Sequence, residues 1–147
     1  MTALQKELST AIAAVVRASR LTQKVFKSLQ AGQKSSAGTV TKLDKSPVTI
    51  ADYGSQAIVN AVLQSVFPAD PIVGEEDSND LRVNTELRQK VWNLVSSTLQ
   101  GTSAKEIEQV GGQLQIDEEM LEMIDKGNFA GGDKGRSALV ESSVLMT

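Results

Sequence analysis

Apolar side chains recur at helical spacing over residues 3–31, and this pattern constrains the fold more than any other feature of the chain. The repeating positions are Leu4, Leu8, Ile12, Val15, Val16, Val25, Phe26 and Leu29. Such a period places them on one face of a helix, and Gly32 stands where glycine commonly ends one. We therefore expect one long or slightly broken amphipathic helix that packs on a core. A coiled-coil or partner-binding helix is the alternative, although only the first half keeps clean spacing.

The middle of the chain is predicted to hold a short strand and a second helix. Residues 39–43 are rich in β-branched side chains, which favours a strand. Residues 45–47 are expected to interrupt that strand, because proline disfavours helix in the residue before it. Asp52, or Thr49 just ahead of it, is well placed to cap a helix over the apolar positions that follow. Pro68 is expected to end that helix.

Later segments repeat the same two kinds of pattern. Residues 71–73 form a short apolar run that predicts a strand. Helical spacing returns at 79–99, closed by Gly101, and again at 116–124. There is no internal repeat and no linker, so the 147 residues form one domain or part of a larger one. Together the elements predict an α+β fold in which two N-terminal helices pack on an incomplete antiparallel sheet.

The chain contains neither cysteine nor histidine, and this excludes several kinds of chemistry. Disulfides, thiolate catalysis, Ser-His-Asp catalysis and zinc sites built from Cys or His all need one of these residues. Any bound metal must be held by oxygen ligands. That donor set favours magnesium, calcium or manganese.

Charge and hydropathy argue against polymeric and membrane partners. The net charge is -3, which offers no general basis for binding a nucleic acid or an anionic membrane. The longest apolar run, residues 11–16, is far shorter than a bilayer span. The first residues lack the layout of a signal peptide, and Glu7 argues against a transit peptide, the alternative that the basic residues up to Lys27 leave open. We expect a cytoplasmic protein.

Asp52 and Glu75 are the first candidate pair of functional residues. They flank a helix of about 16 residues, which would be about 24 Å long. They meet only if residues 71–73 run back along that helix, which the short connection before them favours. Glu75 is the first acid of a Gly-Glu-Glu-Asp cluster at residues 74–77, and magnesium is typically bound through one or two carboxylates. From spacing alone, the alternative is a helix cap at Asp52 and a solvated turn at residues 75–77.

A glycine-rich stretch at residues 127–136 reads Gly-Asn-Phe-Ala-Gly-Gly-Asp-Lys-Gly-Arg. It lacks the Gly-Lys-Ser/Thr ending of a Walker loop. Its two cations, Lys134 and Arg136, could still contact phosphate. A plain connecting segment is the alternative.

Three segments, in order, resemble a known family. Residues 44–56, Asp-Lys-Ser-Pro-Val-Thr-Ile-Ala-Asp-Tyr-Gly-Ser-Gln, resemble the N-terminal signature of 3'(2'),5'-bisphosphate nucleotidases. These enzymes belong to the lithium-sensitive, magnesium-dependent inositol monophosphatase superfamily. Residues 73–78 resemble its Gly-Glu-Glu metal motif, and residues 127–136 resemble the loop that leads into its central metal motif. The resemblance covers residues 1–136, less than half of a typical member.

The resemblance implies a fold, a reaction and two site residues. The fold would be the N-terminal part of a layered α/β/α sugar-phosphatase fold with an incomplete antiparallel sheet. Glu75 would bind Mg²⁺, and Asp52 would orient or deprotonate the attacking water, with Glu76 and Asp77 as acids of the surrounding loop. The substrate would be adenosine 3',5'-bisphosphate, which loses its 3'-phosphate to give AMP in sulfur assimilation or nucleotide salvage. Its sulfated form and inositol 1,4-bisphosphate are related substrates, and inositol monophosphate hydrolysis is an alternative activity.

The chain departs from the family's pattern after Arg136. The family continues into Asp-Pro-Ile-Asp-Gly-Thr, which supplies two metal-binding aspartates and a threonine, and no Asp-x-x-Asp-Gly-Thr occurs here. Residues 137–147 are predicted to be a tail unrelated to the family, and Asp133 is not counted as a ligand. We expect this chain to be inactive or nearly so alone, because Glu75 by itself cannot assemble a multi-metal site. The change of sequence after Arg136 suggests a mispredicted or alternatively spliced gene product, or a frameshift. Members are usually monomeric, whereas this fragment is expected to aggregate or self-associate, or to serve as an interaction or regulatory fragment.

Overall fold

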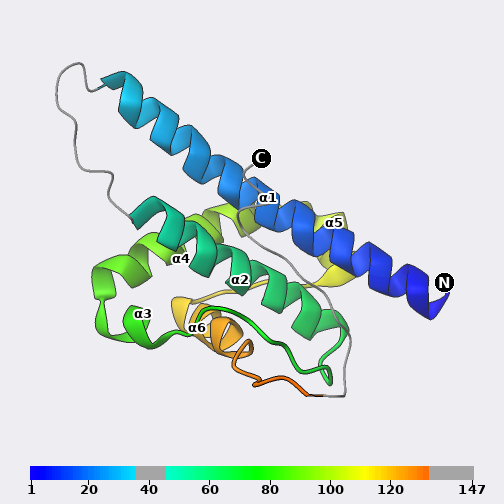
Figure 1. The fold of residues 1–147 in the computed structure, drawn as a ribbon. Helices are drawn as coiled ribbons and strands as arrows, with labels where there is room; N and C mark the ends of the chain where they lie inside the picture. Colours follow the sequence, from blue (N-terminus) through cyan, green and yellow to red (C-terminus); the bar gives the residue numbers. More distant parts are fainter. Residues whose placement is uncertain (36–45, 133–147) are drawn as a thin grey trace.

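The computed structural model describes residues 1–35 and 46–132, and this part of the chain is built of helices (Figure 1). In chain order they are α1 (Ala3–Ser35), α2 (Ser46–Val66), α3 (Asn79–Val83), α4 (Thr85–Gln100), α5 (Ala104–Val110) and α6 (Asp117–Asp125). α2 is central: α1 runs antiparallel along it, and α4 and α6 also pack against it. α5 contacts both α1 and α2.

The prediction of an α+β fold with an antiparallel sheet is wrong, because the described residues form no strand of a sheet. The predicted strand at 71–73 makes only an isolated antiparallel bridge, from Val73 to Asn128. A strand needs a lateral partner along its length, and a bridge at one position does not provide it. An apolar run of three residues cannot be told from an extended connection by its pattern. The strand predicted at 39–43 lies outside the described residues.

The long first helix is confirmed, but only part of its predicted apolar face is buried, as at Val25 in the core. Ala14, Ala18 and Leu21 are buried where α1 meets α2. Small alanine side chains allow two helices to approach closely. By contrast, the first half of the predicted apolar face stays 40–73% exposed, at Leu4, Leu8, Ile12 and Val16.

The predicted start of the second helix is wrong, because α2 begins at Ser46. Proline is accepted in the first turn of a helix, where its missing N–H has no partner, and Pro47 lies in the first turn of α2. Asp52 and Thr49 therefore lie inside the helix, and neither of them caps it. The predicted end is confirmed, because α2 stops at Val66.

The main core lies where α2 meets α1, α4 and α6. Its buried members are Leu21, Val25, Ala51, Tyr53, Ala57, Ile58, Leu81, Val91, Val95, Leu99, Met120, Leu121 and Ile124. Nearly all are aliphatic, as expected for a chain with 3% aromatic residues. α2 packs against several other helices, and this packing fixes the backbone from which its solvent-facing side chains extend.

The later helices follow the sequence prediction in part. The helix predicted at 79–99 is divided, because Asn84 leaves helical geometry and its side chain accepts a hydrogen bond from the N–H of Leu87. Gly101 ends α4 as predicted, and the helix predicted at 116–124 corresponds to α6. α5 was not predicted, since it has seven residues and only Val110 among them is buried. Among the described residues, no helix combines the length and apolar character that a membrane span requires.

Candidate active site

The acidic segment, residues 74–77, lies against the first half of α2 and is held there by Gln56. The Oε1 atom of Gln56 accepts hydrogen bonds from the N–H groups of Glu75, at 3.0 Å, and Glu76, at 2.9 Å. Its Nε2 atom donates to the carbonyl of Glu76 at 2.7 Å and to that of Ile124 in α6 at 3.0 Å. Gln56 follows Asp52 by about one helical turn. The chain therefore returns along α2 to the end that carries Asp52.

The negative charge of Asp52 acts on Glu76 of this segment. Burial raises the pKa of Glu76, and the negative charges of Asp52, Glu75, Asp77 and Asp80 raise it further. Asp52 is half-buried, whereas Glu75 is exposed. The acids around Glu76 are an excess of negative charge, which a bound cation would relieve.

These donors fit magnesium in kind but do not complete a site. Magnesium prefers oxygen ligands, and Asp52, Glu75 and Glu76 each offer a carboxylate. Within residues 1–35 and 46–132, however, no group of three or more acidic side chains is arranged to hold a metal ion. The described residues therefore offer part of a coordination shell at most.

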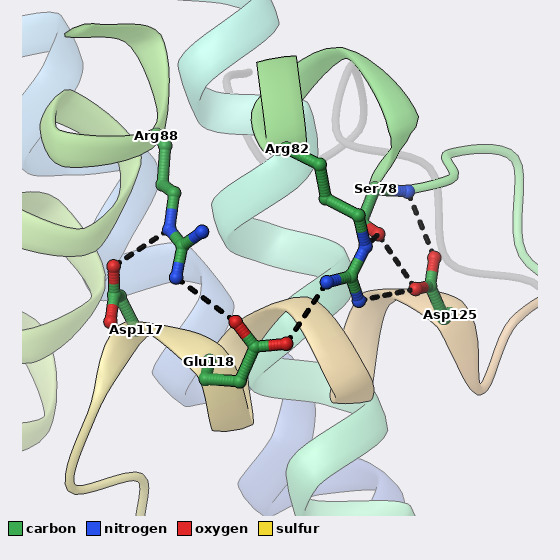
Figure 2. A network of polar contacts seen from close by, with 6 residues as sticks. All are labelled: Ser78, Arg82, Arg88, Asp117, Glu118 and Asp125. Carbon is green, nitrogen blue, oxygen red and sulfur yellow. Dashed lines mark hydrogen bonds and ion pairs between the residues drawn. The ribbon is translucent and has the colours of Figure 1, made fainter. Parts of the chain in front are cut away.

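The far end of the acidic segment is anchored to α6 through Ser78 (Figure 2). Asp125 accepts from the N–H of Ser78 at 2.9 Å and from its hydroxyl at 2.6 Å. Arg82 donates to the Ser78 hydroxyl at 2.8 Å, to Asp125 at 3.1 Å and to Glu118 at 2.9 Å. Burial raises the pKa of Asp125, but the hydrogen bonds from Ser78 and Arg82 outweigh it and hold this pKa below its usual value.

The same network extends from α6 to α4. Arg88 donates to Asp117 at 2.7 Å and to Glu118 at 3.1 Å, as Figure 2 shows. Glu118 therefore lies between two arginines, one from α3 and one from α4. Each exposed ion pair contributes little alone. Together they tie the helices behind the acidic segment to one another.

The start of the glycine-rich stretch lies beside the acidic segment. The carbonyl of Gly127 accepts a hydrogen bond from the N–H of Gly74 at 2.7 Å. Residues 133–136 of the stretch, with Asp133, Lys134 and Arg136, lie outside the described residues, as does the tail at 137–147. A phosphate contact in this stretch, and the exclusion of Asp133 as a ligand, stay predictions.

Sequence reasoning singled out Asp52 and Glu75 but missed the residues that support them. Gln56 contacts positions 19, 20 and 68 residues away, and Asp125 contacts Ser78 across 47 residues. No local pattern pairs such distant positions. The one available signal was that Gln56 ends the motif at residues 44–56.

Comparison with known proteins finds no matching family model. The chain is nevertheless similar to curated proteins along most of its length. It is 54% identical over 131 residues to the 3'(2'),5'-bisphosphate nucleotidase of Schizosaccharomyces pombe, a match that covers 88% of this chain and 36% of that protein. It is 43% identical over 132 residues to the protein of the same name in Emericella nidulans, covering 90% and 36%. It is 42% identical over 138 residues to 3'(2'),5'-bisphosphate nucleotidase 1 of Arabidopsis thaliana, covering 91% and 36%. The chain thus spans about a third of the length of these curated relatives.

Proposed function

The chain belongs to the family of 3'(2'),5'-bisphosphate nucleotidases, spanning about a third of its relatives' length, and we propose that it carries part of a magnesium-dependent phosphatase site. The reaction is removal of the 3'-phosphate from adenosine 3',5'-bisphosphate, which gives AMP and phosphate. Inhibition by lithium, a place in sulfur assimilation or nucleotide salvage, and a cytoplasmic location belong to the same proposal.

Within this reaction, Glu75 binds Mg²⁺ and Asp52 orients the attacking water or accepts its proton. The support is geometric: Gln56 bonds the backbone of Glu75 to the turn of α2 that follows Asp52. The charge of Asp52 also raises the pKa of Glu76, the next residue after Glu75. A bound magnesium ion would lower the pKa of water and stabilise charge on the phosphoryl group.

The proposed site is incomplete in this chain. The sequence has no Asp-x-x-Asp-Gly-Thr motif, and the described residues offer no group of three acidic ligands. Phosphoryl transfer relies on positioned charges around the phosphate, so one or two carboxylates alone do not suffice. We therefore propose that the 147-residue chain does not hydrolyse the substrate alone.

A chimera tests these roles. Residues 1–132 of this chain replace the aligned segment of the Schizosaccharomyces pombe relative, and phosphate release from adenosine 3',5'-bisphosphate is measured with and without MgCl₂. We expect the chimera to be active only with magnesium. Glu75→Ala and Asp52→Asn should each lower kcat at least about a hundredfold.

The matched control is Glu108→Ala, an exposed glutamate of α5, which should leave the rate of the chimera unchanged. The 147-residue chain alone should release no more phosphate than its own Glu75→Ala variant. Full activity of the Glu75→Ala chimera would overturn the assigned roles. Magnesium-dependent activity of the isolated chain would overturn the claim that its site is incomplete.

A further inference from the structure

The carboxamide of Gln56 has all of its hydrogen-bonding capacity filled. A primary amide offers two donor hydrogens and two acceptor lone pairs. Oε1 accepts from the N–H groups of Glu75 and Glu76, and Nε2 donates to the carbonyls of Glu76 and Ile124, all within 2.7–3.0 Å. Rotating the amide by half a turn would set its NH₂ group against two N–H donors. The orientation of Gln56 is therefore fixed by the network.

Two glycines make room for this carboxamide. A Cβ atom at Gly74 would lie 2.7–2.8 Å from the amide atoms of Gln56. A Cβ atom at Gly127 would lie 2.8 Å from Nε2 of Gln56 and 2.9 Å from the Cα atom of Gly74. Neither glycine has a positive φ, so close approach, not backbone conformation, is what requires glycine. The glycine of the Gly-Glu-Glu sequence therefore leaves the space that the carboxamide of Gln56 occupies.

We propose that Gln56 is a positioning residue, which sets the backbone of Glu75 and Glu76 relative to Asp52. This inference rests on the proposed function, because it concerns the orientation of the Glu75 carboxylate, the proposed magnesium ligand. Asp52 and Gln56 share one rigid, buried helix. A site residue whose backbone is bonded to that helix loses little further freedom when the ion binds.

A purely structural role is the competing explanation, since Gln56 also bonds α2 to α6. The chain offers a matched control for that role. Asn60, one turn further along α2, is 2% exposed, and its Nδ2 atom donates to the carbonyl of Met123 at 2.8 Å. Asn60→Leu therefore removes a bond between the same two helices without touching the acidic segment.

The first experiment uses NMR to measure hydrogen exchange at individual backbone amides of the 147-residue chain. Gln56→Met keeps the length of the side chain and removes its hydrogen bonds. We expect exchange at the amides of Glu75 and Glu76 to rise about tenfold or more relative to amides of α4. Asn60→Leu should leave that ratio unchanged. Equal acceleration at all amides in Gln56→Met, or the same local acceleration in Asn60→Leu, would overturn the proposal.

Gly74→Ala is the second variant, and it keeps the proposal testable if Gln56→Met does not fold. Its added Cβ would displace the amide of Gln56 by steric conflict. The same local rise in exchange at Glu75 and Glu76 is expected. Unchanged exchange at both amides would contradict the proposal.

A magnesium titration separates this inference from the proposed function. In the unchanged chain, MgCl₂ should shift the amide signal of Glu75, and Gln56→Met should move the midpoint to about tenfold higher magnesium. Asn60→Leu should not move it. An unshifted midpoint in Gln56→Met would overturn the positioning role. No response to magnesium in the unchanged chain would instead count against Glu75 as a metal ligand, and hydrogen exchange would still decide the role of Gln56.

Discussion

The side chain of Arg17 in α1 is fully buried, and residues from a distant part of the chain compensate its charge. It donates to Glu106 of α5 at 2.8 Å and to the carbonyl of Gly111 at 2.6 Å. Arg20 donates to the second carboxylate oxygen of Glu106 at 3.0 Å. A buried charge is tolerated only when it is paired and hydrogen-bonded. Glu106 therefore holds the end of the molecule where α5 meets α1.

Stability should depend on pH through Glu106. Burial raises the pKa of Glu106, but the hydrogen bonds from Arg17 and Arg20 outweigh it and hold the pKa below 4.5. Since the folded-state pKa is below the unfolded one, the stabilisation is present above the unfolded value and is lost as pH falls through the folded value. At pH 7, Glu106→Gln should lower the free energy of unfolding, measured with urea, by about 2 kcal/mol.

That difference between the unchanged chain and Glu106→Gln should shrink as the pH falls from about 5 to about 3. Other carboxylates titrate in both chains, so they cancel in the comparison. Glu108→Gln, on the exposed side of the same helix, should differ little from the unchanged chain at any pH. A difference for Glu106→Gln that stays constant across this pH range would contradict the prediction.

At the scale of elements, the packing of α1 on α2 depends on a glycine. A Cβ atom at Gly54 would lie 2.8 Å from Cδ1 of Leu21 and 3.4 Å from Cγ2 of Val95. Gly54→Ala gains about 1 kcal/mol of helix propensity but overpacks a filled core, which costs about 1–3 kcal/mol. We expect a net loss of stability in urea unfolding. Gly32→Ala in α1, with no atom within 4 Å, should instead stabilise the chain. A Gly54→Ala variant that is more stable than the unchanged chain would contradict the packing argument.

The helices that sequence reasoning predicted well are those with clear periodicity and clear ends. α6 and the end of α4 at Gly101 are of this kind, whereas α1 continues to Ser35, past the end predicted at Gly32. The start of α2 was misplaced because Pro47 disfavours helix before it but is accepted in a first turn. The prediction of a sheet was wrong because an apolar run of three residues does not specify a strand, which depends on partners elsewhere in the chain. α5 is too short to show a period.

At the scale of the whole molecule, the sequence was informative about which residues to consider and not about how they are held. Asp52 and the acids at 75–77 were identified from residue type, spacing and a family-like motif. Gln56, Ser78 and Asp125 act through contacts across 19 to 68 residues. Such contacts follow from the way α2, α3 and α6 pack together. They become visible only when the helices are placed relative to one another.

The exposed face of α1 leads to the last prediction. Leu4, Leu8 and Ile12 are 73%, 59% and 54% exposed, and their four-residue spacing places them in one row. Contiguous apolar surface of this kind promotes association. In sedimentation velocity at rising concentration, the 147-residue chain should self-associate. The triple substitution of these residues by Gln should reduce that association, with little change in unfolding free energy, since exposed substitutions usually alter it by about 0.5 kcal/mol or less each.

Val83→Gln is the control: it removes a single apolar side chain that is 84% exposed on α3, and it should leave association unchanged. A chain that stays monomeric up to about 1 mM, or a triple variant that associates as the unchanged chain does, would contradict a role for this face.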